Sequence, residues 1–139
     1  MKNAANRTII YLVFLGIIGA CAGKHETTES DDWAELDSYH MIMAESFHPL
    51  KDSSNLAPAK ANAEVLAAEA AKWTSAELPE RVNTDEMKSM IAKLNTSTRA
   101  FADMVGAGAT DEELAAALTA LHGEFHHIME AWEGGHEHH

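Results

Sequence analysis

Apolar residues recur at intervals of three and four positions in four separate stretches after residue 31. This spacing places them along one face of an α-helix, and no stretch shows the two-residue alternation of a half-buried strand. The four faces, in chain order, are Trp33, Leu36, His40, Met43 and Phe47; Ala59, Ala63, Leu66, Ala70 and Trp73; Met87, Met90, Ile91, Leu94, Thr98, Phe101 and Val105; and Leu114, Leu118, Leu121, Phe125, Ile128 and Trp132. The sequence therefore predicts an all-α fold.

Residues that begin or end helices lie between these stretches. The first helix is expected to end at His48-Pro49, because proline disfavours helical geometry in the residue before it. Asn55 is expected to cap the second helix. Thr110 and Glu113 have the spacing of a capping box at the start of the fourth helix.

Four amphipathic helices of similar length, joined by short connections, favour one arrangement. Each apolar face needs neighbours, and short connections favour antiparallel packing. We therefore predict an antiparallel up-down-up-down four-helix bundle over residues 31–133. The 139 residues of the chain suffice for one small domain with a modest core.

The first 20 residues resemble the signal peptide of a bacterial lipoprotein. A basic start is followed by an apolar run over residues 9–19, which is shorter than the roughly 20 residues of a membrane-spanning helix. Small residues precede Cys21, so the resemblance implies that residues 1–20 are removed and that Cys21 is lipidated. Residues 21–30 would form a flexible tether. Ala22 after the cysteine resembles the pattern that sends lipoproteins to the outer membrane, facing the periplasm.

The charge and the single cysteine exclude several functions. With 22 Asp and Glu against 10 Lys and Arg, the formal net charge is −12, so the chain lacks the basic surface that nucleic-acid binding requires. One cysteine rules out an intrachain disulfide, a cysteine-based zinc site and attachment of haem through two thioethers. The nine histidines are the unusual feature of the composition.

Two of these histidines have the spacing of a metal chelate. His122 and His126 are four residues apart, so both imidazoles lie on one face of the predicted helix. His40 falls within the apolar face of the first predicted helix, where a buried imidazole needs a partner. In an antiparallel bundle the first and fourth helices are neighbours, so His40 could face His122 or His126.

Three further side chains are candidates to complete such a site. His48 lies two helical turns after His40, and Met43 would add a soft thioether suited to copper(I), as would Met129. The alternative without a metal is that His40 is a core histidine hydrogen-bonded to a neighbour and that the methionines only fill the core. A di-iron site is disfavoured, because the second and third predicted helices place no acidic residue clearly inward.

Residues 134–139 form a His-rich tail after the fourth predicted helix. This segment follows Gly134-Gly135 and contains three histidines. Such a terminus binds divalent metals loosely or passes them to an internal site.

The region from 31 to 132 resembles the cytochrome c′ superfamily of periplasmic four-helix bundles. His126 corresponds to the haem-ligating histidine, while His122 and Phe125 stand in place of the two haem-attaching cysteines. The resemblance implies the scaffold but not covalent haem. It leaves non-covalent haem b as an alternative cofactor, held by His126 with Met43 or His40.

These observations predict a periplasm-facing lipoprotein that binds a transition metal ion for storage, buffering or delivery. The ion would be copper or zinc, with iron also compatible with imidazole ligands. The alternatives are a haem-binding electron-transfer or sensor protein and a metal-free bundle that docks to an envelope partner. The chain has no nucleophile and base in a catalytic arrangement, so we expect no enzyme activity. The oligomeric state is left undetermined, with a homodimer among the options.

Overall fold

The computed structural model describes residues 32–134, which form four α-helices, one short 3₁₀ helix and no strand. The helices are α1 (Ala34–Ser53), α2 (Ala57–Ser75), α3 (Asp85–Gly106) and α4 (Asp111–Gly134), and η1 (Glu80–Val82) lies between α2 and α3. The all-α prediction is confirmed, and the helices pack as a four-helix bundle. The predicted signal peptide, Cys21, the tether and tail residues 135–139 lie outside the described residues.

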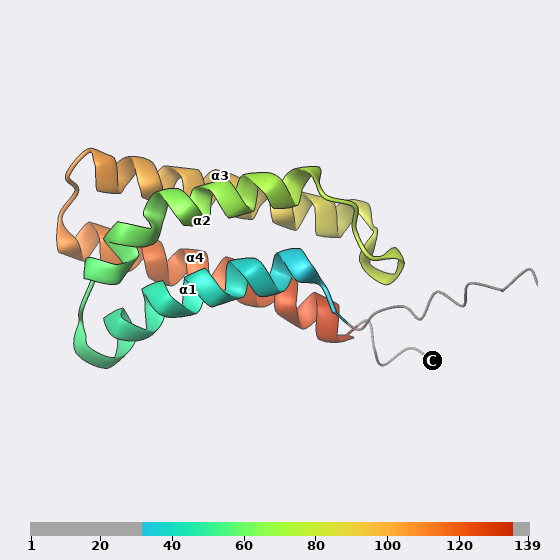
Figure 1. Ribbon diagram of the computed structural model, residues 1–139, viewed down its shortest axis with the longest axis horizontal. Coiled ribbons are helices and arrows are strands. Elements are labelled where there is room, and N and C mark those ends of the chain that lie inside the picture. The colour runs from blue at the N-terminus through green and yellow to red at the C-terminus, as the bar shows by residue number, and fades with distance from the viewer. Residues whose placement is uncertain (1–31, 135–139) are drawn as a thin grey trace, which may run out of the picture.

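Each helix packs against its neighbours in the sequence, and α1 also packs against α4. In Figure 1, α2 and α3 form the upper half of the bundle and α1 and α4 the lower half. The α1–α2 and α3–α4 connections lie at the left end of the view, and the α2–α3 connection lies at the right end. The first and last helices are therefore side by side although they are far apart in the sequence.

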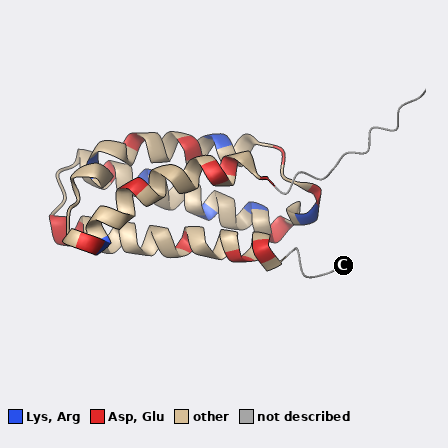
Figure 2. Cartoon of the chain, turned by 60° about the horizontal axis from the view of Figure 1, so that its bottom comes forward, with Lys and Arg blue, Asp and Glu red and all other residues tan. Residues whose placement is uncertain are grey.

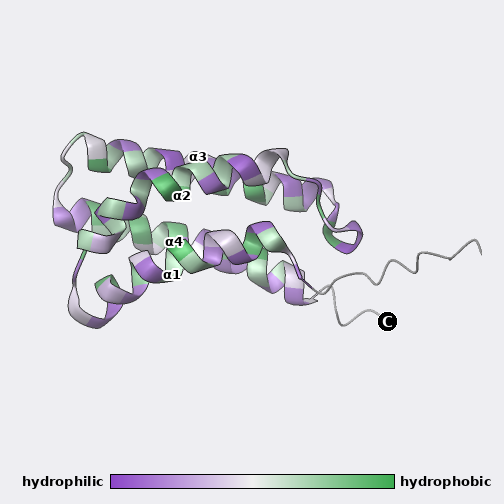
Figure 3. Cartoon of the chain, in the orientation of Figure 1, coloured by the Kyte–Doolittle hydropathy of each residue, from purple (hydrophilic) through white to green (hydrophobic). Residues whose placement is uncertain are grey.

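The core is formed by the apolar faces of all four helices. The faces expected for α2 and α4 are confirmed, since every residue predicted for them is buried. On α3, Met90 and Val105 are only partly buried and the rest of the predicted face is inside. Figure 3 shows hydrophilic and hydrophobic residues on each helix, as expected for helices with one buried face.

Tyr39, rather than His40, occupies the centre of the buried face of α1. Tyr39 is 0% exposed, whereas His40 is exposed. The Tyr39 hydroxyl lies 2.8 Å from the Thr98 hydroxyl, which itself donates to the Leu94 carbonyl, so Tyr39 donates to Thr98. The expectation that His40 is a core imidazole is wrong, because Tyr39 buries a large ring and still satisfies its one polar group.

A similar exchange of neighbouring residues occurs two turns further along α1. Ser46 is fully buried, where the sequence predicted Phe47. The Ser46 hydroxyl donates to the Ile42 carbonyl at 2.8 Å and accepts from the Asn62 amide at 3.3 Å, so its burial leaves no unpaired hydroxyl. Phe47 is only partly buried and lies at the edge of the core, on the side that faces α4.

The prediction that the first helix ends at His48-Pro49 is wrong. Pro49 lies inside α1, which continues to Ser53. A proline near the end of a helix removes one backbone donor but leaves the following turn free to form. The Pro49 carbonyl accepts hydrogen bonds from the Asn55 amide and the Ser53 hydroxyl, both at 3.0 Å, and Ser54 then turns the chain with φ of 54°.

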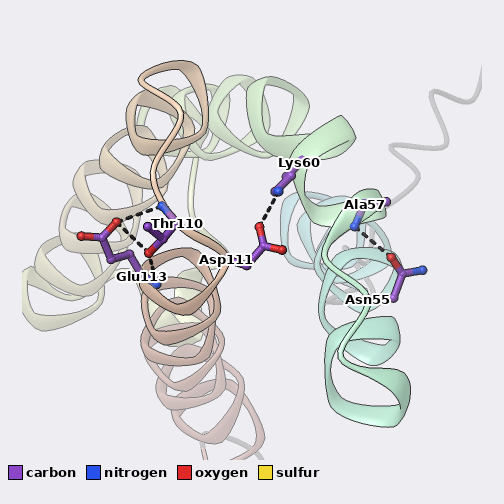
Figure 4. A network of polar contacts seen from close by, with 6 residues as sticks. All are labelled: Asn55, Ala57, Lys60, Thr110, Asp111 and Glu113. Carbon is purple, nitrogen blue, oxygen red and sulfur yellow. Dashed lines mark hydrogen bonds and ion pairs between the residues drawn. The ribbon is translucent and has the colours of Figure 1, made fainter.

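Of the two capping contacts predicted at helix starts, the one at Thr110 forms, whereas Asn55 is not the N-cap residue of α2 (Figure 4). The Thr110 hydroxyl accepts from the Glu113 amide at 3.3 Å, while the Glu113 carboxylate accepts from the Thr110 amide at 2.9 Å. This confirms the capping box. The side-chain oxygen Oδ1 of Asn55 accepts a hydrogen bond from the backbone amide of Ala57 at 3.0 Å. Asn55 lies one residue before the N-cap residue, which is Leu56.

Acidic side chains are spread over the helices (Figure 2). They give the protein its net charge of −12, so its long-range field attracts cations. Within residues 32–134, no helix has the length and apolar character needed to cross a bilayer.

Candidate metal-binding site

The candidate site lies on the α1–α4 seam, the surface strip where α1 meets α4 and which carries His40, Phe47, His122 and His126. The histidines come from two helices that are adjacent only in the folded chain. His122 is partly buried, and His126 and His40 are exposed. The fold thus leaves imidazoles at the surface of the bundle, beside its aromatic core.

His122 and His126 form the centre of this arrangement. Their Nε2 atoms lie 3.2 Å apart, with ring centroids 4.4 Å apart. Two nitrogens bound to one ion at about 2.0–2.1 Å with a tetrahedral angle lie about 3.3–3.4 Å apart. In the metal-free protein one Nε2 donates a hydrogen bond to the other, so a metal ion would replace the shared proton.

Phe47 holds one of the two rings in place. Its ring stacks on that of His122 with centroids 3.8 Å apart and planes 13° from parallel. The pKa of His122 is lowered to about 4, chiefly by burial and then by the positive charges of His126, His48, Lys51 and His40. His122 is therefore neutral at neutral pH, as a metal ligand must be.

His40 and His48 lie within electrostatic reach of the pair. The His40 ring is 5.5 Å from the ring of Phe125 and tilted by 35° to it, which places it against α4. His48 is exposed near the end of α1 and contributes to the low pKa of His122. Within residues 32–134, however, no three His, Cys, Asp or Glu residues are arranged to hold one ion. The structure thus brings together His122 and His126, but neither His40 nor His48 joins them in one ligand set.

The two methionines near the pair differ in position. Met43 is 1% exposed and belongs to the core, whereas Met129 is partly buried at its edge. The stacking of Phe47 on His122 was not predicted from the sequence. The apolar spacing alone could not reveal it, because it assigned Phe47 to the core.

His127 follows the pair directly but points to another flank of α4. Its Nδ1 lies 3.5 Å from a carboxylate oxygen of Glu130, and both side chains are mostly exposed. On the side facing α3, Glu124 forms an ion pair with Lys93 at 3.3 Å. His127 therefore differs from His122 and His126 in surroundings while sharing their helix, which makes it a matched control.

The fold and the site define an all-α protein with two closely spaced imidazoles at the surface of a four-helix bundle. No family model, no curated protein and no solved structure matches this chain. The assignment of function therefore depends on the geometry of the site.

Proposed function

We propose that the protein binds one transition metal ion, copper or zinc, through Nε2 of His122 and Nε2 of His126. The observation that carries the proposal is the 3.2 Å separation of the two nitrogens, which matches that of two ligands on one ion. The proposed task is storage, buffering or delivery of the ion. His126 is exposed, so an ion bound there exchanges readily with solvent or with a partner.

Two features of the seam favour metal binding. His122 needs no deprotonation at neutral pH, so no proton competes with the ion there. The stacked Phe47 ring restricts rotation of the His122 side chain, which reduces the entropy lost on chelation. His40 and His48 remain proposed as further ligands, whereas Met43 is enclosed in the core, and the remaining coordination positions are open to water.

The core beside the site favours a bare ion over non-covalent haem. Tyr39, Met43, Phe125 and Ile128 are each at most 1% exposed. A porphyrin bound by His126 would have to displace several of these side chains. Loss of such packing costs about 2–5 kcal/mol per large residue removed.

The proposal includes the topology and the cellular location. Short connections and their alternating ends support an antiparallel up-down-up-down bundle. The lipoprotein-like start supports lipidation of Cys21 and a place at the outer membrane, facing the periplasm. Mass spectrometry of the protein isolated from membranes tests the latter. An N-terminus other than an acylated Cys21 would contradict it.

Metal binding is tested by titration calorimetry with Zn²⁺ and Cu²⁺ on a protein of residues 22–139, which contains all four helices. Alanine at positions 136, 138 and 139 removes the tail histidines from the measurement. We expect one ion per chain. His122→Ala and His126→Ala should each weaken binding at least about tenfold, since each removes one of two chelating ligands.

His127→Ala is the matched control, because it removes a neighbouring imidazole that lies outside the pair. We expect it to change the affinity less than about twofold. Unchanged binding in a variant lacking both His122 and His126 would rule out this site. Strong absorption near 400 nm after addition of haem, lost with His126→Ala, would favour the haem alternative.

A further inference from the structure

Met129 lies on the same side of α4 as the two imidazoles. It follows His126 by three residues and His122 by seven. At 3.6 residues per turn, the three side chains lie within about 60° of one another around the helix axis. Met129 is partly buried and packs against the core, on the side of α4 that carries the two imidazoles.

Met43, in contrast, is in a poorer position to act as a ligand. Its side chain is 1% exposed and is enclosed in the core on the buried face of α1. Reaching an ion on the surface would require Met43 to leave this packing. An unbranched side chain at the edge of the core can change rotamer at a lower cost. Of the two methionines, Met129 is therefore the better third ligand.

The chemistry of this set discriminates between metals. A thioether is a soft ligand that selects copper(I), whereas Zn²⁺ in structural sites usually takes four nitrogen, sulfur or carboxylate ligands. No three His, Cys, Asp or Glu residues between positions 32 and 134 can hold an ion together. Two imidazoles and one thioether leave Zn²⁺ short of ligands from the protein.

We infer that the preferred ion is copper(I), bound by His122, His126 and the thioether of Met129. This inference rests on the proposed metal-binding function and specifies its ion. The ligand set lies on a single helix, so it needs no movement of α1 towards α4 and no second chain. The pattern is His-x-x-x-His-x-x-Met over residues 122–129.

The test compares the affinities for copper(I) and for Zn²⁺ in residues 22–139 with the tail histidines replaced. Copper(I) affinity is measured without oxygen, by competition with bicinchoninate. Met129→Leu conserves volume and should leave the fold intact. We expect it to weaken copper(I) binding at least about tenfold and to leave Zn²⁺ binding within about twofold.

Met43→Leu is the matched control, because it makes the same replacement on the core side of the seam. We expect wild-type copper(I) affinity from it. The X-ray absorption spectrum of the copper(I) protein should show a sulfur ligand in the wild type and none in Met129→Leu. The spectrum reports the ligands of the ion directly, so a change in the folding stability of the variant does not affect this result.

The outcomes separate the inference from the function on which it rests. Equal copper(I) affinity in the wild type and Met129→Leu, with binding still lost in His122→Ala, would overturn the thioether ligand and leave the metal site standing. Loss of copper(I) affinity in Met43→Leu alone would likewise overturn the assignment to Met129. One copper per two chains, with a doubled mass in solution, would replace Met129 by ligands from a second copy. Full binding without His122 and His126 would remove both proposals.

Discussion

At the scale of single residues, the site depends on how one aromatic ring covers one imidazole. His122 and His126 have the same chemistry and lie one turn apart, yet the Phe47 ring stacks on His122 and His126 remains exposed. Burial makes protonation of His122 costly, because a charged imidazole loses hydration. The pair thus combines an imidazole held neutral with one that is accessible from solvent, as the proposed metal site requires.

We expect the His122 ring in the metal-free protein to titrate with a pKa near 4, measured by NMR. Phe47→Ala should raise this value towards the ordinary 6.5, because it removes the ring that shields His122 from water. Met41→Ala, which removes an exposed side chain of α1, is the control and should leave the titration unchanged. A midpoint near 6.5 in the wild type would contradict this account of the seam.

This pKa also gives the stability of the metal-free protein a defined pH dependence. The unfolded chain binds a proton on His122 near pH 6.5, whereas the folded chain does so only near pH 4. The contribution of His122 to stability is therefore lost as the pH falls from 6.5 to 4, and it does not change further below that range.

At the scale of helices, the capping box at the start of α4 was predicted correctly, whereas the N-cap of α2 and the end of α1 were not. The Thr110–Glu113 capping box forms as predicted, because its contacts join residues only three apart. The pattern at Pro49 was misleading, since a proline disfavours helix continuation but does not forbid it. In α1 the helix continues for four residues beyond Pro49.

Thr110→Ala should lower the free energy of unfolding by about 1 kcal/mol, measured with a chemical denaturant, because it leaves the amide of Glu113 without its side-chain acceptor. Thr119→Ala is the control on the same helix. The Thr119 hydroxyl bonds only to the Ala115 carbonyl on an exposed face, so we expect a change within about 0.5 kcal/mol. Equal losses in both variants would show that the cap is not the cause.

At the scale of the whole molecule, a buried polar contact links two helices that are not adjacent in the sequence. The Tyr39 hydroxyl on α1 meets Thr98 on α3 inside the core, and burial raises the pKa of Tyr39 above its usual value. Around it the Tyr39 ring contacts the rings of Trp73 and Phe125, with centroids 5.9 and 5.2 Å away. Tyr39 thus contacts residues from all three of the other helices.

Tyr39→Phe should cost about 1 kcal/mol of unfolding free energy, because it removes one buried hydrogen bond and keeps the ring. Thr98→Val removes the other partner. The double variant should lose less unfolding free energy than the two single variants lose together, and the difference, the coupling energy, should be about 1 kcal/mol. Fully additive losses would indicate that the two hydroxyls do not interact in solution.

The sequence by itself determined the helical class, the buried faces of α2 and α4, the capping box and the spacing of His122 and His126. All of these depend on residues within a few positions of one another, so helical geometry fixes them. It also placed two imidazoles on one face of α4, and their Nε2 atoms lie 3.2 Å apart.

Only the tertiary structure decided which side of α1 faces inward. Tyr39 and His40 are consecutive, and either one fits between Leu36 and Met43 at helical spacings of three and four residues. The choice depends on Thr98, Trp73 and Phe125, which come from three other helices and provide Tyr39 with a hydrogen bond and close packing. This choice left His40 at the surface and Phe47 against His122, whereas Trp33, Leu36 and Met43 are buried as the sequence predicted.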